Sequence, residues 1–197
     1  MTNVFEKEVG MIDGLLARLS SEPTKPRGFR REDSEEKFLD VNIEEYRNQL
    51  GIIHYWANVF AQESLGTVAL NPSPLLLTKY IVGQSMDEHV DQYVRGANWT
   101  LNRTVSATFV VEQADEGGAL VIQDRERLLP ARKYNPPAGT LLLWPADWWR
   151  FVTRVKRGRR RSLVCWWNNG TEYEHATASP DTSEEVSWCG GNLDGRE

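Results

Sequence analysis

The chain has 197 residues, of which 40% are hydrophobic, and a formal net charge of −5. This length predicts a single domain over residues 1–197, with enough apolar residues for a sizeable core. The acidic charge argues against a general nucleic-acid or membrane-surface binder, because such proteins carry a net basic field. No apolar run approaches the roughly 18 residues of a membrane span, and the first residues lack the features of a signal peptide. We therefore expect a cytoplasmic protein.

Helical spacing dominates residues 1–65. The apolar residues of 4–19 recur at the intervals of an amphipathic helix, and a second helix is predicted from residue 42 to about residue 62. His54 on this second helix is expected to be a packed side chain rather than a ligand. Residues 20–39 are rich in proline, serine and charge, which predicts a surface connection. The N-terminal part is thus predicted to be a helical buttress.

From residue 66 onward the pattern changes to short segments rich in β-branched, leucine and aromatic residues, separated by turn residues. The segments of strand length are LLLTKYIVG, TVSATFVVE, GALVIQD, TLLLWP, RFVTRV and RSLVCWW. This many strands after two helices predicts a mainly β protein, a double-stranded β-helix or jelly roll at 66–170, with the N-terminal helices packed on one sheet. Residues 171–197 are acidic and lose all periodicity, which predicts an irregular tail.

His89 and Asp91 stand two positions apart in the segment YIVGQSMDEHVD, residues 80–91. On a strand, side chains two positions apart point to the same face. An imidazole and a carboxylate on one face, with a further ligand from a distant strand, form the 2-His-1-carboxylate site of non-haem Fe(II) oxygenases. The same short pattern also occurs as a surface histidine beside a solvated aspartate, so the pair alone leaves both interpretations open.

This segment resembles prolyl 4-hydroxylases and PKHD-type hydroxylases of the 2-oxoglutarate/Fe(II) oxygenase superfamily. Their pattern, Tyr-x-x-Gly-x5-His-x-Asp, is matched by Tyr80, Gly83, His89 and Asp91, and the strand segments that follow have the order of that family's barrel. The resemblance implies Fe(II) bound by His89 and Asp91, 2-oxoglutarate as co-substrate, and ascorbate. It also implies oxidation of a C–H bond in a small molecule or a peptidyl residue.

A co-substrate pocket is implied by the same resemblance. In the family, a basic residue at the position of Arg160 binds the far carboxylate of 2-oxoglutarate, and the strand registers of the family imply that Arg160 points into the barrel. A buried arginine needs such a partner, because its guanidinium stays protonated and is costly to bury unpaired. Thr108, Ser162 and Tyr80 are assigned to this pocket, and Tyr80 is equally interpretable as a core aromatic residue.

One position departs from the family, because its distal metal-ligand histidine falls on Arg150. A protonated guanidinium has no lone pair to offer Fe(II), so the third protein ligand is missing or comes from elsewhere. Alternation along its strand directs Arg150 inward, toward His89 and Asp91. We therefore place Arg150 in the predicted catalytic site.

Three functions remain open at this point. The first is an Fe(II)/2-oxoglutarate-dependent oxygenase with an atypical metal site, in which Arg150 pairs with an acidic group of the substrate or with Asp91. The second is a degenerate, metal-free jelly-roll binding module, in which the charge of Arg150 replaces that of the metal and the pair with Asp91 is preformed. The third is the binding of nucleic acid or of an acidic partner by the seven basic residues between 150 and 161. Alternate residues of a strand face opposite sides, so these charges are not expected to form one surface. The substrate, small molecule or peptide, and the oligomeric state are not readable from the sequence.

Overall fold

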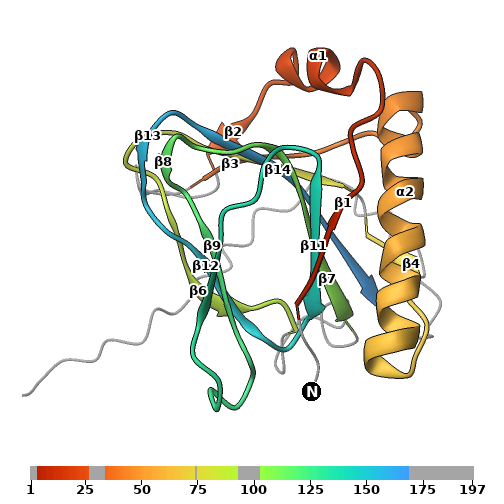
Figure 1. Ribbon diagram of the computed structural model, residues 1–197. Helices are drawn as coiled ribbons and strands as arrows, with labels where there is room; N and C mark the ends of the chain where they lie inside the picture. Colours follow the sequence, from red (N-terminus) through yellow and green to blue (C-terminus); the bar gives the residue numbers. More distant parts are fainter. Residues whose placement is uncertain (1–3, 27–33, 74, 93–102, 169–197) are drawn as a thin grey trace, which may run out of the picture.

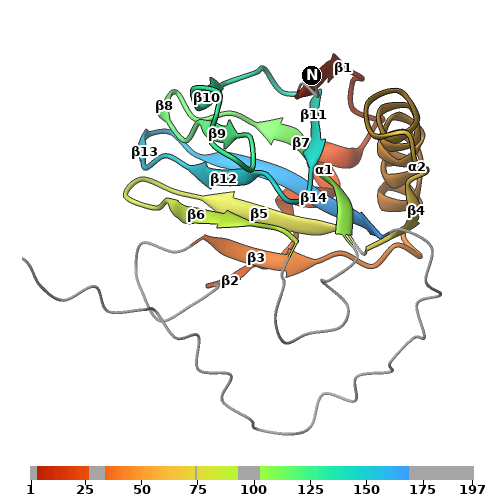
Figure 2. The ribbon, with the colours of Figure 1, turned by 90° about the horizontal axis from the view of Figure 1, so that it is seen from below.

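A computed structural model describes residues 4–26, 34–73, 75–92 and 103–168. Strands dominate these ranges and form two antiparallel sheets that face each other, with a small third sheet at one end (Figures 1 and 2). The acidic tail predicted at 171–197 lies outside the described residues.

The larger sheet has eight strands in the order β1-β11-β7-β14-β5-β3-β2, and β4 pairs with β14 beside this path. Their bounds are β1 Phe5–Glu8, β2 Lys25–Pro26, β3 Glu35–Phe38, β4 Leu70–Pro72, β5 Leu76–Tyr80, β7 Arg103–Glu112, β11 Thr140–Pro145 and β14 Arg160–Asn168. The central strands β7 and β14 are buried along nearly their whole length, because the sheet is covered on both faces.

The smaller sheet has the order β10-β9-β12-β6, and β8 pairs with β13 at the end of the barrel. The bounds are β6 Met86–Val90, β8 Glu116–Gly117, β9 Leu120–Gln123, β10 Arg132–Tyr134, β12 Trp149–Val152 and β13 Val155–Arg157. Side chains from both sheets meet in one interior cluster, in which Leu142 and Trp144 of β11 pack with Leu120 and Ile122 of β9 and with Val152 of β12. This double-sheet jelly roll confirms the predicted fold class.

Helix α2, Glu44–Phe60, covers the outer face of the larger sheet (Figure 1) and continues into a π-helical turn, η1 Ala61–Leu65. It packs on the outward-facing apolar side chains of β7, β11 and β14. Trp167 of β14 donates its indole N–H to Nδ1 of His54 at 2.7 Å, so His54 is a packed side chain, as predicted. None of the described helices is both long and apolar enough to cross a membrane.

The helix predicted over 4–19 is wrong in its first half. Residues Phe5–Glu8 form β1, which pairs with β11 at the edge of the larger sheet, and only Leu15–Ser20 form a helix, α1. Gly10 and Gly14 adopt positive φ angles of 72° and 80°, a conformation that interrupts a helix. Without this segment β11 would be an edge strand with unpaired backbone groups, and Phe5–Glu8 forms hydrogen bonds with them. Helical spacing in the sequence could not predict this pairing.

The surface connection predicted at 20–39 also needs correction, because it contributes β2 and β3 to the larger sheet. Strand β3 pairs antiparallel with β5 and so extends the sheet beyond the barrel. The second helix begins at Glu44 rather than at residue 42, and Ile43, its N-cap, makes no side-chain cap hydrogen bond. The backbone N–H of Asn42 is instead bound by a carboxylate oxygen of Asp40, at 2.9 Å.

Candidate ligand site in the barrel

The inner face of the larger sheet is polar in the middle of the barrel. Thr78, Ser106, Thr108 and Ser162 are buried there, each at most 4% exposed, on the adjacent strands β5, β7 and β14. The alternate residues of these strands, such as Phe109, belong to the apolar core under α2. Buried hydroxyl groups are unfavourable unless they have partners. A polar interior backed by an apolar exterior therefore favours a binding site over ordinary core packing.

His89 and Asp91 meet at one end of this interior. His89 lies on β6 and Asp91 follows the last residue of that strand, with Nε2 of His89 and Oδ1 of Asp91 3.6 Å apart. The His89 side chain is 27% exposed, whereas that of Asp91 is 3% exposed. The histidine thus reaches the rim of the site, and the carboxylate lies inside it.

Arg150 binds the carboxylate of Asp91 with two hydrogen bonds. It lies opposite His89 in the pairing of β12 with β6 and is 5% exposed. Its Nε donates to Oδ2 and its Nη2 to Oδ1, both at 2.7 Å, and Ser106 donates its hydroxyl to Oδ2 at 2.7 Å. Burial by itself raises the pKa of Asp91, but the charge of Arg150, with a smaller contribution from His89, holds that pKa well below its usual range. The carboxyl group of Asp91 is therefore ionised at neutral pH.

The described residues do not fit the Fe(II) site that the resemblance implies. Both oxygens of Asp91 are occupied by Arg150, and a guanidinium cannot ligate a metal. Across the ranges that the structure describes, no three His, Cys, Asp or Glu residues are grouped so as to hold a metal ion. A preformed pair is the arrangement expected of the metal-free alternative, and it differs from an open metal site.

Arg160 is a buried cation on the inner face of β14. It is 1% exposed, its Nη1 donates to Oε1 of Gln113 at 2.7 Å, and its Nε is buried without a hydrogen-bond partner. Among the described residues, no carboxylate pairs with it. Burial, assisted by Arg150 and opposed by Tyr80, lowers the pKa of Arg160 to about 10, so the guanidinium is still charged at neutral pH. A buried, charged donor of this kind fits the carboxylate of a ligand.

Tyr80 and Met86 lie between the two buried arginines. The Tyr80 hydroxyl donates to Sδ of Met86 at 3.3 Å, and Nη1 of Arg150 is 3.9 Å from the same sulfur. Both Arg150 and Arg160 act electrostatically on the Tyr80 phenol. Burial nevertheless raises the pKa of Tyr80, so the residue is neutral. A continuous row of side chains therefore connects Asp91 with Arg160.

Trp144 contributes a further polar atom to the interior that sequence reasoning could not find. Its side chain is fully buried, and its Nε1 has no hydrogen-bond partner. Its ring centroid lies 5.8 Å from Cζ of Arg150. Only the atoms around the ring reveal this unpartnered donor.

The basic residues of β12 to β14 do not form one surface. Arg150 and Arg160 are inside the barrel, whereas Arg159 and Arg161 both bind the carboxylate of Glu112, at 2.8 and 2.7 Å. This division between opposite faces argues against a nucleic-acid surface on these strands.

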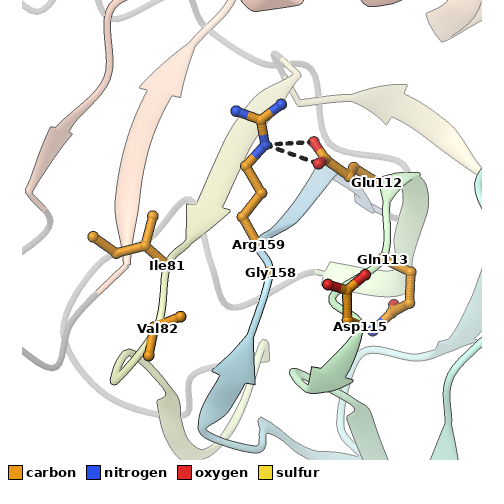
Figure 3. Close-up of a pocket in the computed structure, with 7 residues that line it drawn as sticks. All are labelled: Ile81, Val82, Glu112, Gln113, Asp115, Gly158 and Arg159. Carbon is orange, nitrogen blue, oxygen red and sulfur yellow. Dashed lines mark hydrogen bonds and ion pairs between the residues drawn. The ribbon is translucent and has the colours of Figure 1, made fainter.

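A surface groove of about 540 Å³ lies outside the Arg160 end of the barrel. Figure 3 shows Gly158 and Arg159 passing between Ile81 and Val82 on one side and the segment that carries Gln113 on the other. Because Gln113 lines the groove and also binds Arg160, it separates the buried guanidinium from the surface.

Comparison with known proteins agrees with this architecture. Residues 75–168 match the model of the 2OG-Fe(II) oxygenase superfamily. A PKHD-type hydroxylase of Methylobacterium nodulans is 37% identical over 98 residues, which cover 47% of this chain and 42% of that protein. The match thus spans less than half the length of the curated relative.

Solved structures share the fold at low sequence identity. A prolyl-4-hydroxylase of Pseudomonas putida has a TM-score of 0.66 and 17% identity, covering 87% of this chain and 95% of that one. A prolyl hydroxylase of Trichoplax adhaerens, in complex with a peptide fragment of the hypoxia-inducible factor, has a TM-score of 0.67 and 12% identity, covering 86% and 84% of the two chains. Residues 75–168 therefore match the 2OG-Fe(II) oxygenase superfamily in sequence and lie in a barrel with the prolyl hydroxylase fold, which confirms the resemblance.

Proposed function

We propose that the barrel of this protein is a metal-free binding module of the oxygenase superfamily, which holds a carboxylate ligand at Arg160. The observation that carries the proposal is the preformed pair between Arg150 and Asp91. The guanidinium supplies the positive charge beside Asp91 that a metal ion supplies in the iron sites implied by the superfamily. The carboxylate is thereby satisfied without iron.

The energy of the pair supports this assignment. Both side chains are at most 6% exposed, so separating them leaves a buried charge without a partner, at a cost of about 3–5 kcal/mol. Fe(II) would have to overcome that cost before it could reach either oxygen of Asp91. Arg160, in contrast, has no anionic partner among the residues that the structure describes, and its guanidinium can accept a carboxylate without displacing one.

A second candidate function is an Fe(II)/2-oxoglutarate-dependent oxygenase with an atypical metal site, acting on a small molecule or a peptidyl residue. The juxtaposition of His89 and Asp91 and the superfamily match favour it. In this case Fe(II), 2-oxoglutarate and ascorbate are the expected cofactors, and His89 and Asp91 are the protein ligands. The candidate requires Arg150 to leave Asp91, for example for an acidic group of the substrate.

Calorimetric titration with Fe(II) under anaerobic conditions, with and without 2-oxoglutarate, separates the two functions. We expect no stoichiometric Fe(II) binding in either condition, because Arg150 retains Asp91. Fe(II) that binds only together with 2-oxoglutarate would support the oxygenase, since a chelating co-substrate is what a site with two protein ligands needs. Tight binding of Fe(II) alone would contradict both descriptions of the site.

Arg160→Ala tests the carboxylate anchor. The variant should weaken the binding of butyrate, glutarate and 2-oxoglutarate by about 3 kcal/mol, roughly a hundredfold, because a buried charge-assisted contact is lost. Arg157→Ala is the matched control, since the Arg157 side chain is 70% exposed and pairs with Asp115 at the surface. Calorimetry on both variants, with circular dichroism to verify folding, provides the measurement. A change of less than threefold in Arg160→Ala would move the anchor to another residue.

A further inference from the structure

We infer that the ligand reaches Arg160 from the surface groove at that end of the barrel and displaces the side chain of Gln113 from the guanidinium. The rest of the ligand, an apolar chain, then lies in the groove beside Ile81 and Val82. This inference rests on the proposed function, because it takes Arg160 as the carboxylate anchor. It adds the direction of binding, the residue that is displaced and the class of ligand.

Gln113 closes the groove side of Arg160. Its Oε1 accepts a hydrogen bond from Nη1 of Arg160 at 2.7 Å, and the same residue lines the groove. Its Nε2 donates to Oδ1 of the exposed Asn135 at 2.7 Å and to the backbone oxygen of Gly118 at 3.3 Å. Gln113 comes directly after β7 and is half-buried. A ligand that arrives through the groove therefore meets Gln113 before it meets the guanidinium.

A carboxylate is a better partner for Arg160 than the amide of Gln113. The amide is neutral and accepts one hydrogen bond from this guanidinium, through Nη1. A carboxylate adds the attraction between opposite charges, and its two oxygens can accept parallel bonds from the planar guanidinium. Rotation about the side-chain torsions of Gln113 moves the amide away without a change in the backbone. The carboxylate can therefore take the place of the amide oxygen.

The opposite side of Arg160, toward Asp91, is occupied by side chains in contact. The hydroxyl of Tyr80 lies 3.3 Å from Sδ of Met86, and the same sulfur lies 3.9 Å from Nη1 of Arg150, which holds Asp91. A ligand that extended inward would have to separate this row. The groove has a volume of about 540 Å³, within the range of about 300–1,000 Å³ that is usual for small-molecule sites. The groove therefore accommodates the rest of the ligand without disturbing the buried pair.

An apolar wall indicates the chemistry of that part of the ligand. Ile81 and Val82, between β5 and β6, line the groove and are 41% and 59% exposed (Figure 3). Covering exposed apolar side chains with an apolar chain removes both surfaces from water, which is favourable. The geometry thus points to a carboxylate that carries an aliphatic chain.

The acidic side chains that line the groove face cations. Glu112 accepts hydrogen bonds from Nε of Arg159 at 2.8 Å and from Nε of Arg161 at 2.7 Å. Asp115 is paired with Arg157, with 3.6 Å between Oδ2 and Nε. These arginines reduce the repulsion that the two carboxylates exert on an anionic ligand.

The test is the dependence of affinity on chain length, measured by calorimetry on the whole protein with butyrate, hexanoate and octanoate. Complete burial of one methylene group corresponds to about a fourfold gain in affinity, and we expect about half of that free energy in an open groove. Hexanoate should thus bind about fourfold, and octanoate about sixteenfold, more tightly than butyrate. An affinity that stays constant or falls with chain length would overturn this inference and leave the carboxylate site at Arg160 in place. Failure of all three acids to bind would overturn the proposed function as well.

Val82→Ser tests whether the chain lies in the groove. It removes part of the apolar wall, so the gain from butyrate to octanoate should fall below about fourfold. Leu128→Ser is the matched control, because Leu128 is 83% exposed on the loop between β9 and β10, away from the residues that line the groove. This control should keep the full gain. A gain that is equal in Val82→Ser and the wild-type protein would place the chain elsewhere and overturn the inference.

Substitutions of Gln113 test the exchange on Arg160. Gln113→Glu supplies an internal carboxylate, so butyrate should bind at least about tenfold more weakly, whereas Gln113→Ala removes the competing amide and should bind butyrate more tightly. Asn135→Asp is the control for charge, because it adds the same charge at an exposed position and keeps an acceptor for Nε2 of Gln113. Its affinity for butyrate should change less than about threefold. Unchanged binding in Gln113→Glu would overturn the displacement of Gln113, and the wild-type series decides the direction of binding even if a variant does not fold.

Discussion

Arg150→Ala is expected to lower the free energy of unfolding by about 3–5 kcal/mol, because it leaves the carboxylate of Asp91 buried without its partner. Asp91→Asn should have an effect of the same sign, because it leaves the guanidinium of Arg150 unpaired instead. The double variant should lose much less than the sum of the two single variants, since neither charge then remains. Urea denaturation of the four proteins of this cycle measures the coupling.

The control for this cycle is the exposed pair of Arg127 with Glu88, whose nitrogen and oxygen are 2.7 Å apart and whose side chains are 47% and 38% exposed. Glu88→Ala should cost at most about 1 kcal/mol, because water screens the pair. Additive effects of Arg150→Ala and Asp91→Asn would contradict the buried pair.

The same pair should make stability depend on pH in one direction. The folded-state pKa of Asp91 lies below its ordinary value of 3.8, so the pair contributes fully above that pH and its contribution declines as the pH falls below it. This decline should be missing in the variant that lacks both charges.

Arg150→His is expected to create a metal site. The new imidazole would lie opposite His89 in the pairing of β12 with β6, and both oxygens of Asp91 would be released, which completes two histidines and one carboxylate. Fe(II) at a hundred times its Kd should then raise the free energy of unfolding by about 2.7 kcal/mol, whereas the wild-type protein should not respond. Anaerobic denaturation with and without Fe(II) measures the difference.

Arg150→Gln is the matched control for the metal experiment, because it removes the charge without adding a ligand for iron. It should respond to Fe(II) much less than Arg150→His does. If Arg150→His does not gain metal affinity, position 150 does not face His89 and Asp91 in the way that the strand pairing indicates.

Much of the fold was predictable because its strands are locally distinctive. The segments of β5, β7, β9, β11, β12 and β14 are rich in β-branched, leucine and aromatic residues and are bounded by turn residues. Both properties are local. The segment Phe5–Glu8 was misjudged for the opposite reason. Its apolar residues also fit helical spacing, and its strand state depends on pairing with β11 and on the packing of Phe5 against Trp56 and Phe60. Those partners are distant in sequence.

The sequence by itself determined the spacing of His89 and Asp91 and which residues share a strand face with Arg150 and with Arg160, because alternation along a strand is set by the local backbone. Only the tertiary structure decided what these side chains bind. Asp91 and Arg150 are 59 residues apart in the chain, and whether a guanidinium reaches both carboxylate oxygens depends on how β12 is placed against β6. The absence of a carboxylate at Arg160, among the described residues, likewise depends on every strand around it. An ion pair or an unpartnered charge is a relation between atoms in space, and spacing along one strand cannot specify it.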